Sequence, residues 1–300
     1  MKKYVTPLIP IVTAVLTFVC LSFLLPKAGS LIKAETRSDN DNYKQTVHFV
    51  ALGDSLTQGV GDETNRGGFV PLVADSLKNQ YNLSTVQTEN FGISGERSDQ
   101  ILKRLNKDEE LRRSLESADM ITLTVGGNDL LQAFQKNITA TSAKKFNQSI
   151  KKYQKNVEKI LIETRKLNKN APIYILGIYN PYYLNFSDIK EMQTVVDNWN
   201  EATKDLTEET RNSFFVPVND LLYKGLPEGS TKNSATMNST ADSSNESSTE
   251  QTTEGATVKN NVLYDGDNFH PNNLGYQIMA NAVKEEMIKT NELWLLKERK

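Results

Sequence analysis

The strongest constraint on the fold is an alternation of short apolar runs with longer, helix-like stretches. Four runs are rich in Val, Ile, Leu and Phe, and a fifth is more polar and has the weakest strand signal. In chain order they are residues 47–52, 85–91 (the polar run), 120–125, 173–178 and 214–218. Strands separated by whole helices pair in parallel through crossovers, and helices then cover both sheet faces. The pattern therefore predicts an α/β fold, a three-layer α/β/α sandwich around a five-stranded parallel sheet.

The stretches between these runs include three predicted helices. Before the fourth run, apolar side chains recur every three or four positions, as on one face of an amphipathic helix. They are Phe146, Ile150, Tyr153, Val157, Ile160 or Leu161, and Leu167. The opposite face carries six lysines, which is typical of a solvated surface. Residues 191–210 and 273–289 are predicted as further helices.

The N-terminal segment differs from the rest of the chain. Lys2 and Lys3 precede an uncharged run over residues 4–26, which is typical of a signal peptide or a short membrane anchor. Lysines ahead of a first apolar span favour export of the chain beyond that span. We therefore expect residues 1–30 to be a signal peptide or anchor and residues 31–45 a linker. The remainder is expected to be secreted or anchored on the extracellular face of the membrane.

A second unusual segment spans residues 229–257, where about half of the residues are Ser or Thr and none is aromatic. It buries too little apolar surface to offset its ordering entropy, so a disordered insertion is predicted. A glycosylated or wall-spanning spacer is the alternative. At roughly 150 residues per domain the length suggests two domains, but without these two segments the chain fits one domain over residues 46–300.

Composition excludes several classes of function. The chain has 35 Lys and Arg against 37 Asp and Glu, a formal net charge of −2, so it lacks a large basic field for a nucleic acid. Its one cysteine, Cys20, rules out an intramolecular disulfide and a Cys-rich metal site. We expect no metal and no cofactor. A mechanism that needs an imidazole has only His48 and His270 available.

Small and polar residues follow three of the predicted strands and recur near the C-terminus. In open α/β sheets, ligands bind at the carboxyl ends of the strands. Each cluster alone is also typical of a turn with helix N-capping, but together at one edge they indicate a functional site. The clusters are Gly53-Asp54-Ser55-Leu56, Asn90-Phe91-Gly92, Gly126-Gly127-Asn128-Asp129 and Asp267-Asn268-Phe269-His270.

Ser55 is the candidate nucleophile, because a serine hydroxyl becomes reactive when an imidazole oriented by a carboxylate takes its proton. His48 lies in the strand that leads to Ser55, about 16 Å back along the strand axis, and is out of reach. His270 is predicted in a loop, and Asp267 can orient its ring across one turn. The expected triad is therefore Ser55, Asp267 and His270.

Ester hydrolysis also needs donors for the oxyanion of a tetrahedral intermediate. The candidates are the backbone N–H groups of Ser55 and Gly92 and the side-chain amide of Asn128. A glycine at position 92 lets the backbone approach the substrate closely. Asp54 and Asp129 are expected to be structural, as caps or in loop hydrogen bonds beside the site, without direct roles in the chemistry.

The four clusters, in this order, resemble the motif blocks of the SGNH hydrolases, also called the GDSL lipase/acylhydrolase family. The chain looks closest to the bacterial lysophospholipase-like branch. The resemblance implies a flavodoxin-like sheet and a serine ester hydrolase with Ser55 as nucleophile. It further implies that Gly92 and Asn128 are oxyanion donors and that Asp267 and His270 complete the triad. The segment 229–257 departs from the pattern, because it is longer than the last block needs.

The chain is therefore expected to be an exported serine esterase or lipase, acting on a small-molecule or lipid ester. An uncleaved N-terminal segment would also contact the membrane. A cell-wall carbohydrate O-acetylesterase is the first alternative, and a non-catalytic surface binding protein is the second. Tyr179, Tyr182 and Tyr183 follow the fourth predicted strand, where they would line an acyl pocket or pack within a loop.

Overall fold

A computed structural model describes residues 42–137, 142–181, 183, 190–226 and 260–297. The predicted signal or anchor segment at 1–30, most of the linker at 31–45 and the insertion at 229–257 lie outside these residues. Within the described part of the chain, no helix combines the length and the hydropathy needed to cross a membrane.

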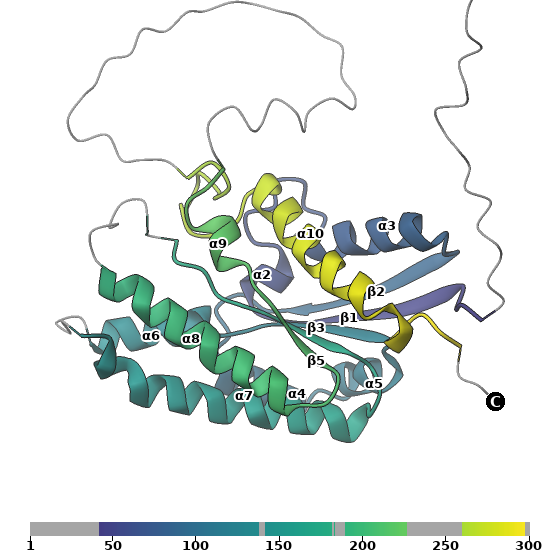
Figure 1. The fold of residues 1–300 in the computed structure, drawn as a ribbon, viewed down its shortest axis with the longest axis horizontal. Helices are drawn as coiled ribbons and strands as arrows, with labels where there is room; N and C mark the ends of the chain where they lie inside the picture. The colour runs from purple at the N-terminus through teal and green to yellow at the C-terminus, as the bar shows by residue number, and fades with distance from the viewer. Residues whose placement is uncertain (1–41, 138–141, 182, 184–189, 227–259, 298–300) are drawn as a thin grey trace, which may run out of the picture. The chain divides into compact units, whose positions relative to one another are not determined.

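The core is a sheet of five parallel strands in the order β2-β1-β3-β4-β5 (Figure 1). This is the doubly wound, flavodoxin-like order, in which the strand order reverses beside β1. The strands are β1 (Thr46–Gly53), β2 (Thr85–Gly92), β3 (Met120–Thr124), β4 (Ile173–Leu176) and β5 (Ser213–Val216).

Helices cover both faces of this sheet, as Figure 1 shows. The α-helices among the described residues are α2 (Ser55–Gln58), α3 (Phe69–Tyr81), α4 (Ser98–Leu105), α5 (Glu109–Ser117), α6 (Gly127–Lys136), α7 (Asn147–Leu167), α8 (Lys190–Glu209), α9 (Asn219–Leu222) and α10 (Asn273–Lys289). The three helices expected from periodicity correspond to α7, α8 and α10 within one residue at either end.

The side chains of β1 alternate between two apolar layers, as the two-residue period of a strand requires. Phe49 and Ala51 join the layer formed with α3 and α10. Val50 and Leu52 join the layer formed with α4, α5, α7 and α8. Because both faces are buried, the strand reads as a continuous apolar run, which is why its sequence signal is so clear.

The predicted fold class is confirmed, and all five predicted strands are present. The weak signal of residues 85–91 reflects their place at the sheet edge, since most side chains of β2 are exposed or half-buried. β4 ends two residues earlier than the apolar run, because the Ile178 N–H donates to Asn200 Oδ1 (2.8 Å) instead of to a strand. The chain beyond Leu176 thus leaves the sheet and lines a pocket described below.

A buried amide in the connection from α7 to β4 ties that connection to the end of α5. Asn168 Nδ2 donates to the carbonyls of Leu115 (2.9 Å) and Ala118 (2.8 Å), and Asn168 Oδ1 accepts from the Ala171 N–H (2.9 Å).

We predict that Asn168→Ala lowers the free energy of unfolding by about 2 kcal/mol, because it leaves buried carbonyls unsatisfied. Urea denaturation measures this. Asn170→Ala, at an exposed neighbouring position, should change stability by less than about 0.5 kcal/mol, and equal losses in both variants would contradict the prediction.

Candidate active site

Ser55 lies where β1 leaves the sheet, as the first residue of the short helix α2, and its side chain is mostly buried. Asp54 caps this helix, because its carboxylate accepts the N–H of Leu56 at 3.1 Å. Gly53 is required at the preceding position, since a Cβ there would lie 2.2 Å from Thr124 Oγ1. A tight turn and a cap therefore set the position of Ser55.

Asp54 is buried in a network with the last residue of β3. Thr124 Oγ1 donates to Asp54 Oδ1 (2.8 Å), accepts the Asp54 N–H (3.1 Å) and lies 2.8 Å from Thr57 Oγ1. Burial raises the pKa of the Asp54 carboxyl, and hydrogen bonds from Thr124 and Leu56 and the charge of His270 only partly oppose this. The carboxyl group thus joins two strand ends beside Ser55, as expected for a structural cap.

Asp267 and His270 form a hydrogen-bonded pair within one loop. Asp267 Oδ2 lies 2.6 Å from His270 Nδ1, and Asp267 Oδ1 accepts the N–H groups of Phe269 and His270, both at 2.9 Å. Burial alone would raise the pKa of Asp267, but the bonds from the His270 ring and from these two backbone groups outweigh it and lower the pKa. Asp267 therefore stays ionised to a lower pH than an ordinary aspartate, and it orients the ring.

Contacts from distant parts of the chain fix the loop that carries His270. The Tyr179 hydroxyl, just after β4, donates to the Phe269 carbonyl at 2.6 Å. Gly61 packs so closely that a Cβ there would lie 2.5 Å from the Pro271 carbonyl and 3.2 Å from His270 Cβ. The loop is therefore held from both the β4 side and the α2 side.

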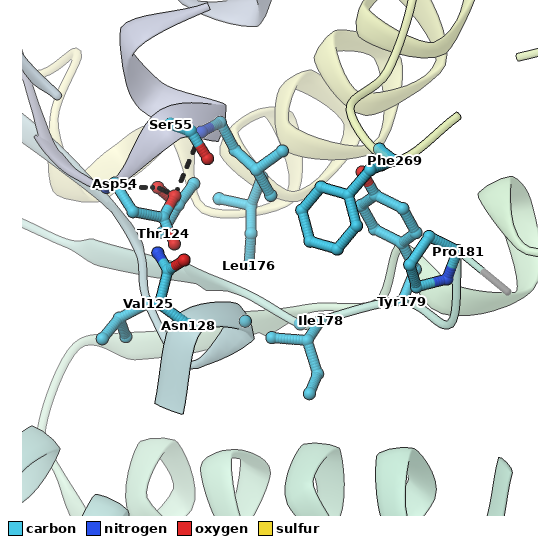
Figure 2. A pocket seen from close by; sticks show the side chains of 13 residues that line it. Asp54, Ser55, Thr124, Val125, Asn128, Leu176, Ile178, Tyr179, Pro181 and Phe269 are labelled. Carbon is cyan, nitrogen blue, oxygen red and sulfur yellow. Dashed lines mark hydrogen bonds between the residues drawn. The ribbon is translucent and has the colours of Figure 1, made fainter. Parts of the chain in front are cut away.

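A small apolar pocket, partly open to solvent, adjoins Ser55 (Figure 2). Figure 2 shows the Ser55 and Asn128 side chains at one end and Phe269, Tyr179 and Pro181 at the other. The pocket is lined by Asp54, Ser55, Leu56, Thr124, Val125, Gly127, Asn128, Leu176, Gly177, Ile178, Tyr179, Pro181 and Phe269. Because Phe269 lines it, the loop that carries His270 shares a wall with Ser55.

The candidate oxyanion donors differ in whether they are available to a ligand. Asn128 lines the pocket, and its Nδ2 uses one hydrogen for the Glu96 carbonyl (2.9 Å), which leaves the other for a ligand. The Gly92 N–H instead donates to Asn90 Oδ1 (2.9 Å), and Gly92 is not among the pocket-lining residues. Gly95, which the sequence analysis did not single out as a donor, does not line the pocket either, but its N–H has no hydrogen-bond partner among the described residues. It directly precedes Glu96, whose carbonyl accepts from Asn128. The glycine itself is the sequence signal, because position 95 has a left-handed backbone, with φ of 82°, that favours glycine.

Gly92 is therefore not an available donor in this structure. The physical reason is local, because the amide oxygen of an asparagine can capture the N–H two residues further along the chain.

The three candidate tyrosines have different surroundings. Tyr179 lines the pocket. Tyr182 lies outside the described residues. Tyr183 packs edge-on against Tyr223, with ring centroids 4.5 Å apart, and does not line the pocket.

The remaining polar candidates, His48 and Asp129, make hydrogen bonds that join elements of the fold. His48 Nε2 lies 3.1 Å from Glu89 Oε2, so it pairs with the neighbouring strand, away from Ser55. Asp129 accepts the N–H and the hydroxyl of Ser98, at 2.8 and 2.6 Å, and anchors the start of α4. No group of three or more His, Cys, Asp or Glu residues suited to a metal ion occurs among the described residues.

Comparison with known proteins identifies relatives across most of the chain. A model of the GDSL-like lipase/acylhydrolase family matches residues 49–283. The chain is 29% identical over 270 residues to the uncharacterized protein YpmR of Bacillus subtilis, covering 90% of this chain and 91% of YpmR. It is 31% identical over 141 residues to the spore germination lipase LipC of Bacillus licheniformis, covering 46% of this chain and 66% of LipC.

One further sequence relative and one solved structure are also similar to the chain. An acetylxylan esterase of Geobacillus stearothermophilus is 24% identical over 173 residues, covering 55% of this chain and 73% of the esterase. The crystal structure of Lip_vut3, a lipase from a goat rumen metagenome, superposes with a TM-score of 0.60 at 23% identity. That comparison covers 80% of this chain and 96% of Lip_vut3, and it supports the fold.

The opposite pKa shifts of Asp54 and Asp267 predict opposite effects of pH on stability. The folded pKa of Asp54 is raised, so the folded chain binds more protons than the unfolded chain between the unfolded and folded pKa values. Wild-type stability relative to Asp54→Asn should therefore fall as the pH rises through that interval. The folded pKa of Asp267 is lowered, so wild type should have its full stability advantage over Asp267→Asn above the unfolded pKa of this group. That advantage should be lost as the pH falls through the folded pKa.

Urea denaturation of the three proteins at pH values from about 3 to 7 measures both differences. The same pH trend in the two comparisons would show that one of the assigned shifts has the wrong sign.

Proposed function

The chain belongs to the GDSL-like lipase/acylhydrolase family, whose members are the SGNH hydrolases, and is a serine ester hydrolase; on that premise we propose that it is an exported, lysophospholipase-like esterase. In this proposal Ser55 is the nucleophile and Asp267 and His270 complete its triad. The observation that carries the proposal is the apolar pocket beside Ser55, walled by the loop of His270.

In the proposed reaction the Ser55 hydroxyl attacks the carbonyl carbon of the ester. His270 takes the hydroxyl proton on its second ring nitrogen while Asp267 holds Nδ1, and His270 then returns the proton to the leaving alcohol. Water attacks the resulting acyl-enzyme with the same base and releases the acid. Because the pKa of Asp267 is lowered, this carboxylate can stabilise the imidazolium that forms.

Three donors are proposed for the oxyanion. The Asn128 amide has one hydrogen available, and the N–H groups of Ser55 and Gly95 have no partner among the described residues. The Gly92 N–H expected from the sequence would serve only after it leaves Asn90 Oδ1. Donors of this kind act on the charge that develops in the transition state.

The chemistry of the pocket favours an acyl chain longer than acetyl. Its walls are mostly aliphatic and aromatic, among them Leu56, Leu176, Tyr179 and Phe269. Each methylene buried there contributes about 0.8 kcal/mol, which is about fourfold in kcat/KM. The alternative, a cell-wall carbohydrate O-acetylesterase, has support from the acetylxylan esterase among the relatives.

Export is part of the proposal. It rests on Lys2 and Lys3 ahead of the uncharged residues 4–26. The segment then serves as a cleaved signal or as an anchor on the extracellular face of the membrane.

An acyl-chain series tests the substrate class. With p-nitrophenyl acetate, butyrate and octanoate, we predict that kcat/KM rises by up to about fourfold per methylene until the pocket is filled. Highest activity on acetate would support the acetylesterase and reject the lipid-type substrate. Ser55→Ala is the control, since it should abolish both turnover and labelling by a fluorophosphonate probe. Undiminished labelling of that variant would reject Ser55 as the nucleophile.

Asn128→Ala tests the oxyanion assignment. Loss of one donor should lower kcat by about 10²–10³-fold, measured on the best ester of the series. Asn137→Ala removes a side chain at the other end of α6 whose amide caps that helix by donating to the Ala133 carbonyl, and its kcat should stay within about twofold. Near-normal turnover of Asn128→Ala would reject the donor role.

A further inference from the structure

The loop that follows β2 connects the proposed oxyanion donors with β1, the strand that leads to Ser55. The Ile93 N–H donates to the Gly53 carbonyl at 3.0 Å, one residue before the Asp54 cap. At the other end of the loop, the Glu96 carbonyl accepts from Asn128 Nδ2 at 2.9 Å. Gly95, whose N–H has no partner in the described part of the chain, lies between these two attachments. Movement of this loop would therefore displace Gly95 and the Asn128 amide together.

One guanidinium group binds both strand ends and this loop. Arg104 Nη2 lies 3.0 Å from the Phe91 carbonyl and 3.3 Å from the Gly53 carbonyl. Its Nη2 and Nε also lie 2.7 and 3.0 Å from Glu96 Oε2. Arg104 thus contacts the C-terminal ends of β1 and β2 as well as the loop that follows β2.

The Arg104–Glu96 pair is well placed to be rigid. The two side chains are only 12% and 14% exposed, so water competes weakly for the bonds. A guanidinium group presents its donors in a fixed planar arrangement, unlike the single flexible ammonium group of lysine. By contrast, Arg97 lies in the same segment but pairs with Asp99 at a more exposed position.

We propose that Arg104, through Glu96, is a positioning residue for the oxyanion site. It holds the loop so that Gly95 and Asn128 lie correctly relative to Ser55, and it does not touch the substrate. The inference rests on the proposed esterase function. A misplacement of about 1 Å in such a site costs about 10²-fold in rate, and the loss falls on kcat because the oxyanion forms only in the transition state.

The first test is Arg104→Lys in the full-length chain, which keeps the charge but loses the planar array of donors. We predict that kcat on the best p-nitrophenyl ester falls by about 10-fold or more while KM stays within about twofold. Arg97→Lys is the matched control and should keep both constants within about twofold. A kcat of Arg104→Lys within twofold of wild type, or a loss confined to KM, would overturn the proposal.

A double-mutant cycle separates positioning from a general structural defect. If Arg104 acts through the donors, Arg104→Lys should cost much less in the Asn128→Ala background than in the wild-type background. An equal fold-loss in both backgrounds would overturn the proposed action of Arg104 through Asn128. Glu96→Gln, which keeps an acceptor oxygen but removes the charge, should lower kcat in the same direction. It carries the test if Arg104→Lys does not fold.

Amide hydrogen exchange tests the loop without using catalysis. The Ile93 and Glu96 amides should exchange faster in Arg104→Lys than in wild type, while the amides of α7 keep their rates. Unchanged exchange in the loop would overturn the proposal. Absence of wild-type turnover on every ester would overturn the proposed function, whereas this measurement would still decide the role of Arg104.

Discussion

The site depends on the hydrogen bonds between Asp54 and Thr124 at the ends of β1 and β3. This carboxylate and hydroxyl are almost fully buried, and together they satisfy a backbone N–H and the start of α2. A buried carboxyl group is costly unless it is hydrogen-bonded, so the two strand ends cannot separate without leaving polar groups unsatisfied. Ser55 follows Asp54 directly, and the position of the proposed nucleophile is thus coupled to the stability of the sheet.

The rest of the site is built by connections that return to this edge of the sheet. The loop of His270 is held by the Tyr179 hydroxyl and by close packing against Gly61. The loop after β2 is held by Arg104 and Asn128. Each connection is anchored by a group from a different element, which allows a site made of loops to be rigid. Rigidity matters here, because donors aimed at an oxyanion are effective only when they are positioned in advance.

Much of the fold could be predicted from the sequence because buried positions are apolar and recur with the period of the strand or helix. The fully buried strands β3 and β4, and β1 from Phe49 onward, are rich in apolar residues, and the buried side chains of α7 recur every three or four residues. The edge strand β2 gave the weakest signal, since it is exposed over most of its length. Pattern alone could not tell that Gly92 would be captured by Asn90 while the N–H of Gly95 was left without a partner among the described residues.

The sequence by itself determined the five strands, the three longest helices, the turn at Ser55 and the pairing of Asp267 with His270, which lie three residues apart in one loop. These features depend on local contacts and on the periodicity of burial, and both can be recognised from residues close together in the sequence. Only the tertiary structure decided which of the tyrosines reaches the pocket, which backbone donors are available and that Arg104 links two strand ends. Those outcomes depend on contacts between residues far apart in sequence, such as Arg104 with Gly53 or Tyr179 with Phe269, and no local pattern encodes them.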